Sequence, residues 1–121
     1  MQKALFMRDY KKYTVWELGH EITLDIYKLT ASFPKEEIYS LTSQMRRAAY
    51  SIPSNIAEGC GRESDQEFKR YLVIARGSST ELEYFLILVK DLKFIEFSDF
   101  EKLSDSVNKV KRSLSNLINK L

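Results

Sequence analysis

The residues with the clearest potential for metal chemistry are Glu17 and His20, which lie three positions apart in a stretch with helical periodicity. Di-iron bundles use this Glu-x-x-His spacing because it places both side chains on one face of a helix. Such a centre needs a second copy of the motif, and His20 is the only histidine in the chain. We therefore expect no metal site, no cofactor, and an ordinary surface histidine.

No other pattern indicates catalysis. The serines and aspartates lack a strand-turn-helix nucleophile elbow, and the glycines at residues 59–61 follow a helical pattern rather than a strand. Cys60 is the single cysteine, so the chain forms no internal disulfide, and a lone thiol at a helix end is usually inert. We expect a protein that acts by binding, with no catalytic residues, no enzyme activity and no small-molecule substrate.

A group of polar residues surrounds these glycines. Asn55 and Glu58 lie three positions apart, close to Arg62 and Arg70. One interpretation is a pocket that contacts RNA or another ligand, and the other is a buried polar network that fixes the turn between two helices. We favour the network, since buried polar groups persist when they satisfy one another.

Two further basic groups are candidates for contact with phosphate. Arg46 and Arg47 either bind phosphate or pair with carboxylates such as Glu81 or Glu83. A basic stretch near the C-terminus is either an RNA surface or a solvated helix face. The net charge is only +2, so binding to nucleic acid requires local clustering. The candidate RNA contacts are Arg46, Arg47, Arg62, Arg70, Lys109, Lys111 and Arg112.

Four stretches must position these residues, each with apolar side chains every three or four positions, as is typical of amphipathic helices. Ser64 and Ser98 each precede a glutamate by three positions, which predicts capping boxes at the start of the third and fourth helices. With 121 residues, of which 44% are hydrophobic, the chain fits one all-α four-helix domain. The predicted elements are a partly ordered arm at residues 1–13 and helices at about 14–33, 41–59, 65–92 and 99–120.

The second helix carries a small-residue motif. Pro53 removes one amide donor and crowds the carbonyl of Ala49, so we expect a kink there. Gly59 and Gly61 are expected to end the helix in left-handed backbone.

The short loop after this helix predicts an antiparallel third helix. Counting outward from Gly61 brings Ile52 near Tyr71 and places Gly77 at a close helix contact, which offsets its cost of about 1 kcal/mol relative to alanine. The structural motif comprises Ala49, Pro53, Asn55, Glu58, Gly59 and Gly77.

The third helix has apolar residues on too many sides for one subunit. The runs at residues 71–75 and 84–89 point in every direction around the axis, and three partner helices cannot cover all of them. The uncovered side predicts a homo-oligomer, with aromatic residues of the first helix as further contacts. The predicted interface residues are Trp16, Tyr27, Val73, Ile74, Tyr84, Ile87 and Leu88.

The sequence QMRRAAYSIPSNIAEG at residues 44–59, with Phe33 and Pro34 before it and IARGSSTELE at residues 74–83 after it, resembles the four helix bundle protein family. Members of this family are also called 23S rRNA intervening-sequence proteins. The resemblance implies an up-and-down antiparallel four-helix bundle, a homopentamer and an association with RNA, with no catalytic residues. The fold is also similar to that of the accessory protein of diversity-generating retroelements, which implies an alternative function as a protein-binding scaffold or reverse-transcriptase accessory subunit.

The sequence also predicts a location. No apolar run reaches the roughly 20 residues that span a bilayer, and no charged-then-apolar leader precedes a cleavage site. Together with the single cysteine, this predicts a cytoplasmic protein without a membrane partner.

Overall fold

The computed structural model describes residues 8–121, in which every regular element is helical. Residues 1–7 of the predicted arm lie outside the described residues. The long helices are α2 (Thr14–Thr30), α3 (Ser43–Cys60), α4 (Asp65–Asp91) and α5 (Phe97–Asn119). The short ones are the 3-10 helices η1 (Tyr10–Lys12) and η2 (Lys35–Glu37) and the π-helix η3 (Ile38–Thr42).

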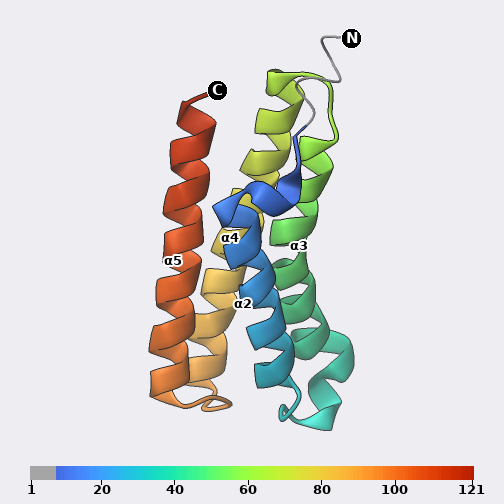
Figure 1. Cartoon of the computed structure of the whole chain (residues 1–121). Helices are drawn as coiled ribbons and strands as arrows, with labels where there is room; N and C mark the ends of the chain where they lie inside the picture. Colours follow the sequence, from blue (N-terminus) through green and yellow to red (C-terminus); the bar gives the residue numbers. More distant parts are fainter. Residues whose placement is uncertain (1–7) are drawn as a thin grey trace.

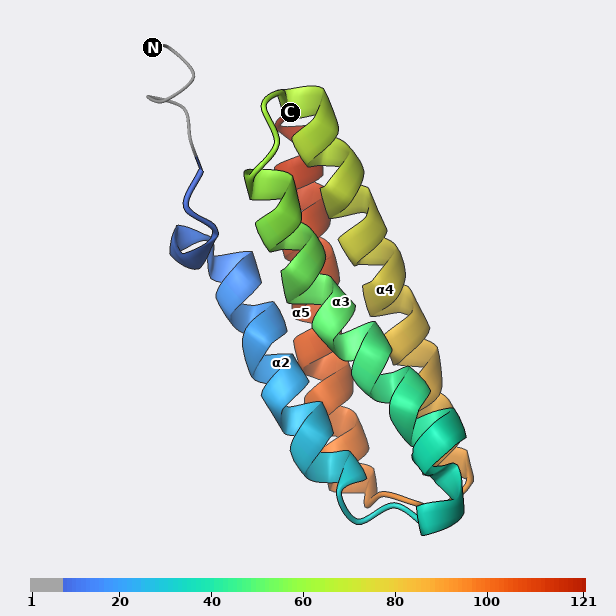
Figure 2. The same ribbon diagram turned by 90° about the vertical axis from the view of Figure 1, so that its right-hand side faces the viewer.

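The four long helices lie side by side along one axis, and the connections between consecutive helices lie at alternate ends (Figures 1 and 2). The α2–α3 and α4–α5 connections share one end, and the α3–α4 connection lies at the other end near the C-terminus. α3 packs on α2 and α4, and α5 packs on α4 and α2. None of the helices in the described part of the chain is long and apolar enough to cross a membrane.

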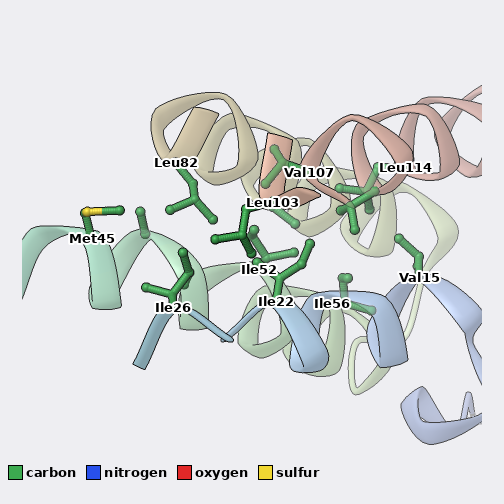
Figure 3. Packing of buried hydrophobic residues seen from close by; sticks show 14 of the residues in the cluster. Val15, Ile22, Ile26, Met45, Ile52, Ile56, Leu82, Leu103, Val107 and Leu114 are labelled. Carbon is green, nitrogen blue, oxygen red and sulfur yellow. The ribbon is translucent and has the colours of Figure 1, made fainter. Parts of the chain in front are cut away.

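The core is a column of buried side chains to which each long helix contributes one stripe (Figure 3). The stripes follow the spacing of three and four residues that predicted the helices. Fully or almost fully buried members include Ile22, Ile26, Met45, Ile52, Ile56, Leu82, Val107 and Leu114.

The helix ends differ from the prediction at two places. α2 ends at Thr30, before residue 33, because Phe33 turns inward and packs edge-on against Phe94, with ring centroids 5.4 Å apart. The box at Ser64 is confirmed, since its hydroxyl accepts a hydrogen bond of 3.1 Å from the Glu67 amide. The capping box predicted at Ser98 is wrong, because α5 begins at Phe97 and Ser98 therefore lies inside the helix.

The reason for the early start of α5 is the geometry of the α4–α5 connection. Lys93 adopts left-handed backbone with φ 63°, and the Phe94 amide donates back to the Val89 carbonyl at 2.9 Å. This tight reversal places Glu96 in extended backbone at the N-cap, so helical backbone resumes one residue before Ser98.

α3 and α4 approach each other closely at Gly59, and this contact corrects the predicted register. A Cβ on Gly59 would lie 2.8 Å from the Cβ of Tyr71 and 3.1 Å from Cδ1 of Phe68. Tyr71 therefore lies against Gly59, seven residues along the chain from Ile52, which was its predicted neighbour. The prediction that Gly59 and Gly61 end this helix in left-handed backbone is wrong, since neither has a positive φ. Glycine is needed at position 59 because the contact with α4 leaves no space for a side chain.

The prediction that Gly77 lies at a close helix contact is wrong. Gly77 is exposed on α4, and a Cβ added there would meet no atom of the chain within 4 Å. The buried positions of α4 include Leu72, Ala75, Ser79 and Leu82, whose spacing of three and four leaves Gly77 on the outer face.

Pro53 lies inside α3, and α2 compensates for the amide that it lacks. The Thr23 hydroxyl shares its proton between the Gly19 carbonyl at 2.8 Å and the Ala49 carbonyl at 3.1 Å. The Ala49 carbonyl is the group that Pro53 leaves without its helical donor. A Cβ on Gly19 would lie 3.0 Å from Cγ2 of Ile52 and 3.4 Å from Cδ of Pro53. Glycine at position 19 thus lets α2 approach closely enough for Thr23 to reach the buried Ala49 carbonyl.

Candidate nucleic-acid interface

The predicted RNA contacts fall in three separate regions of the bundle. Two arginines lie near the start of α3, two flank the α3–α4 connection at the opposite end, and three basic residues lie on α5 (Figure 1). In that order, the regions hold Arg46 and Arg47; Arg62 and Arg70; and Lys109, Lys111 and Arg112.

The first region borders a groove of about 770 Å³ between the end of α2, the turn that follows it, and the start of α3. Among the described residues that line it are three basic side chains and three tyrosines, and none is an aspartate or glutamate. We call it the tyrosine–arginine groove, and its polar and aromatic lining comprises Tyr27, Thr30, Phe33, Lys35, Tyr39, Thr42, Ser43, Arg46, Arg47 and Tyr50.

Arg46 is fixed in this groove by α2. Its Nε donates to the Thr30 hydroxyl at 2.8 Å, its Nη2 donates to the Tyr27 carbonyl at 3.3 Å, and its guanidinium lies 4.5 Å from the centroid of the Tyr27 ring. Within the subunit, the predicted pairing of Arg46 with Glu81 or Glu83 is wrong, because the side chain donates to groups of α2. The charge is held in position by neutral groups and is not neutralised by a carboxylate.

The other two basic residues of the groove are free. Lys35 and Arg47 are exposed, and neither side chain makes a hydrogen bond or ion pair with any residue from 8 to 121. Glu83, which was the other predicted partner for Arg47, accepts a hydrogen bond of 3.0 Å from Lys111. The groove therefore carries a local cluster of positive charge, although the net charge of the whole chain is only +2.

The second region is centred on Tyr71. Arg62 joins two helices, since it donates to the Glu58 carboxylate of α3 at 2.8 Å and to the Tyr71 hydroxyl of α4 at 2.7 Å. The hydrogen bond to Glu58 raises the pKa of Arg62 above its ordinary value. Arg70 lies 4.8 Å from the Tyr71 ring centroid and 3.6 Å from Glu67.

This network differs from the predicted one in two respects. Glu58 is exposed, so the network lies at the surface, and Asn55 takes no part because its amide donates to the Ser51 carbonyl within α3 at 2.7 Å. The Arg62 and Arg70 charges are largely matched by adjacent carboxylates. The region holds the α3–α4 connection together and offers little free positive charge.

The third region is also partly neutralised. Lys111 pairs with Glu83 at 3.0 Å, whereas Lys109 and Arg112 are exposed. Lys111 and Arg112 border a shallow depression of about 320 Å³. Two unpaired charges on an open helix face are typical of a solvated surface.

The predicted interface residues lie in three different environments. Trp16 packs within the subunit, where it stacks on His20 with ring centroids 5.2 Å apart, and Leu88 packs against the core. Tyr27 lies in the tyrosine–arginine groove. The remaining four, which are between 39% and 56% exposed on the outer side of α4, are Val73, Ile74, Tyr84 and Ile87.

The residues considered for metal or thiol chemistry are not arranged for it. The described part of the chain contains no group of three or more His, Cys, Asp and Glu side chains that could hold a metal ion. Cys60 is buried, and burial raises the pKa of its thiol from 9.0 to about 11. Its reactive thiolate form is therefore scarce at neutral pH.

Comparison with known protein families identifies the family of this chain. The family described as "23S rRNA-intervening sequence protein" matches residues 11–116, which include α2, α3, α4, all but the last three residues of α5, and the groove. The chain belongs to this family. The resemblance inferred from the sequence around Pro53 is thereby confirmed.

A solved structure supports the fold of this family member. A protein of unknown function from the S23 ribosomal protein family of Bacteroides thetaiotaomicron superposes with a TM-score of 0.80 at 24% sequence identity, over 87% of this chain and 95% of that one. At this level of identity the likeness shows the fold alone. A comparison with curated proteins finds no match.

The sequence identified the arginines of the groove but not most of its other polar residues, namely Thr30, Lys35, Tyr39, Thr42, Ser43 and Tyr50. The spacing of four residues in the sequence could have identified part of this lining. Tyr39, Ser43, Arg46 and Tyr50 follow one another at intervals of four, three and four, which indicates a polar face opposite the buried stripe of the same segment.

Proposed function

We propose that this protein is a non-enzymatic, RNA-associated protein of the cytoplasm, in which an up-and-down four-helix subunit assembles with copies of itself and binds RNA through the tyrosine–arginine groove. The observation that carries the proposal is the meeting of Lys35, Arg46 and Arg47 in a groove without a carboxylate among its described lining residues. Guanidinium groups suit phosphate because their planar donors match its oxygens. The family name, which refers to insertions in 23S rRNA, supports an RNA partner.

The groove is favoured over the two other basic regions because none of its three basic residues is paired with a carboxylate and all three line one groove, whereas Lys109 and Arg112 lie unpaired on an open helix face. Arg62, Arg70 and Lys111 each lie near a carboxylate, at distances of 2.8 to 3.6 Å. A phosphate that approached them would have to compete with that carboxylate. In the groove Arg46 is already oriented, so less side-chain freedom is lost on binding.

We expect RNA binding that weakens steeply with salt. Arg46→Gln combined with Arg47→Gln should reduce the magnitude of the log-log slope of affinity against salt by about 1.4, if each residue contacts one phosphate of a single strand at about 0.7 per contact. Fluorescence anisotropy with a labelled RNA across a salt series measures this slope.

The matched control is Lys109→Gln combined with Arg112→Gln, which removes the same charge from α5. This pair should leave the slope within about 0.3 of the parent, because its residues are not in the groove. Failure of the parent to bind RNA at low ionic strength would contradict the proposed function. Assembly without RNA binding would favour the alternative of a protein-binding scaffold.

Self-assembly is supported by the outer side of α4. Val73, Tyr84 and Ile87 expose large apolar surfaces there, and Gly77 lies on the same side with no atom of its own chain near its Cβ position. Several large apolar side chains exposed on one side of a helix often mark an interface. Glycine among these side chains would let the backbone of another copy approach closely.

We expect a mass that is a multiple of the 14.2 kDa subunit when size exclusion is coupled to light scattering. Five copies is the number that the family resemblance implies. Ile87→Glu should produce the monomer, since it places a charge in the apolar face, whereas Leu24→Glu, at a residue of α2 that is 55% exposed, should leave the assembly intact. A monodisperse monomer of the parent protein at micromolar concentration would contradict self-assembly.

A further inference from the structure

The tyrosine–arginine groove carries aromatic surface that phosphate binding does not explain. Tyr39 is 96% exposed and Tyr50 is 45% exposed. No described aromatic ring or cation stacks on either of them, whereas the Tyr27 ring is covered by the Arg46 guanidinium at 4.5 Å. Two tyrosine rings with free faces thus flank a cluster of three basic side chains.

The backbone that presents Tyr39 is itself unusual. Tyr39 belongs to η3, a five-residue π-helix that continues directly into α3 and contributes Ile38, Tyr39 and Thr42 to the groove. π-Helical turns are rare and are found frequently at functional sites. Leu41 anchors this segment in the hydrophobic core, whereas Ile38 and Tyr39 are both exposed and pack on no part of it.

Thr42 gives an independent indication of a polar ligand. Its side chain lines the groove and is only 5% exposed, yet its hydroxyl has no hydrogen-bond partner among residues 8–121. An unpaired buried hydroxyl destabilises the folded state, so such groups are normally satisfied by protein, water or ligand. A ligand with hydrogen-bonding groups that entered the groove would remove this cost.

These three features together match the chemistry of a nucleotide whose base is unpaired. A positively charged groove attracts the phosphates, exposed tyrosine rings stack on bases, and both are combined in proteins that bind single strands. The volume of about 770 Å³ lies in the range of sites that hold small organic ligands. Bases in an RNA duplex are stacked on one another, so their faces are inaccessible to Tyr39 and Tyr50.

We propose that the tyrosine–arginine groove binds an unpaired nucleotide in single-stranded RNA, with phosphates on Lys35, Arg46 and Arg47 and a base stacked on Tyr39 or Tyr50. This inference rests on the proposed RNA association and adds the class of RNA that is recognised. A duplex reaches the exposed cations of the groove through its phosphates alone, so it binds more weakly than the single strand.

The test compares two fluorescent probes of identical sequence at low salt, a 12-nucleotide RNA without self-complementarity and the same RNA annealed to its complement. Tyr39→Leu combined with Tyr50→Leu keeps apolar bulk and removes the rings. We expect the Kd for the single strand to rise tenfold or more, and the Kd for the duplex to change less than twofold. The salt slope should stay that of the parent because no charge is removed.

The control is Phe97→Leu, which removes an aromatic ring that is 60% exposed on α5, outside the groove. It should leave both affinities unchanged. If the tyrosine variant binds both probes like the parent, or loses affinity for both equally, the inference is wrong while the proposed function stands. If the parent binds neither probe at low ionic strength, the proposed function fails and the inference with it.

Two further measurements sharpen the result. Thr42→Val should weaken single-strand binding without lowering the stability of the free protein, since the hydroxyl has no partner to lose. Unchanged affinity would overturn the assignment of Thr42 as a ligand contact. If polyglutamate displaced the single strand as well as unlabelled RNA of equal charge does, an acidic protein segment would replace RNA as the occupant.

Discussion

Gly59→Ala should lower the free energy of unfolding by about 1–3 kcal/mol per subunit, because the added methyl group overpacks the contact between α3 and α4. The new Cβ would lie 2.8 Å from the Cβ of Tyr71 and 3.3 Å from the carbonyl oxygen of Phe68. One of these atoms is a Cβ and the other is a backbone oxygen, so no side-chain rotation relieves the clash. α4 must therefore move. This cost exceeds the helix propensity of about 1 kcal/mol that alanine gains over glycine.

The matched control is the same substitution at Gly77, which also lies inside a long helix. Its Cβ position is empty to 4 Å, so Gly77→Ala should raise the free energy of unfolding by about 0.5–1 kcal/mol. Urea denaturation of both variants at one protein concentration measures the difference, and the fixed concentration matters because assembly contributes to stability. If Gly59→Ala were as stable as the parent, α3 and α4 would be farther apart at this point than the structure shows.

The contrast between these glycines shows what helical periodicity determines. The stripe formed by Leu72, Ala75, Ser79 and Leu82 identifies the buried face of α4, and the same spacing excludes Gly77 from it. The sequence could therefore have placed Gly77 outside. It could not have placed Gly59 against Tyr71, because the distance between two helices depends on the geometry of the connection at residues 61–64 and on how their side chains interlock.

The same limit applies to the helix ends. The box at Ser64 was predictable because its hydroxyl and the Glu67 amide lie three residues apart in any helix that starts there. The pattern at Ser98 is equally good in sequence and fails, because the left-handed backbone of Lys93 sets where α5 begins. A local capping pattern contains no information about the backbone geometry of the turn that precedes it.

The candidate site was predicted in part for a similar reason. Arg46 and Arg47 were identified by charge and by their place beside the buried stripe. The other residues of the groove were missed for two reasons. Tyr39 lies in a segment that was predicted as a connection, and the predicted partners of the arginines were carboxylates on α4. The direction in which Arg46 points is decided by Thr30 and the Tyr27 carbonyl, and this tertiary contact leaves no local pattern in the sequence.

Thr23→Val should lower the free energy of unfolding by about 1–3 kcal/mol, because it leaves the buried Ala49 carbonyl without a donor. Valine has nearly the shape of threonine, so the packing of α2 on α3 is preserved and only the hydroxyl is lost. Thr80→Val is the matched control. The Thr80 hydroxyl also bonds a carbonyl four residues earlier, at 3.2 Å from Arg76, but it is exposed, so its loss should change stability by less than about 0.5 kcal/mol.

A double-mutant cycle with Pro53→Ala separates this hydrogen bond from every other effect of the substitution. Alanine at position 53 restores an amide that can donate to the Ala49 carbonyl within α3, so that carbonyl no longer depends on Thr23. Thr23→Val should then cost less in the Pro53→Ala background than in the parent, with a coupling energy of about 0.5–3 kcal/mol, the range for residues in contact. Strict additivity in urea denaturation would mean that Thr23 does not compensate for the proline. A measured coupling would show that the proline of the family motif is tolerated inside α3 because the neighbouring helix supplies the missing donor.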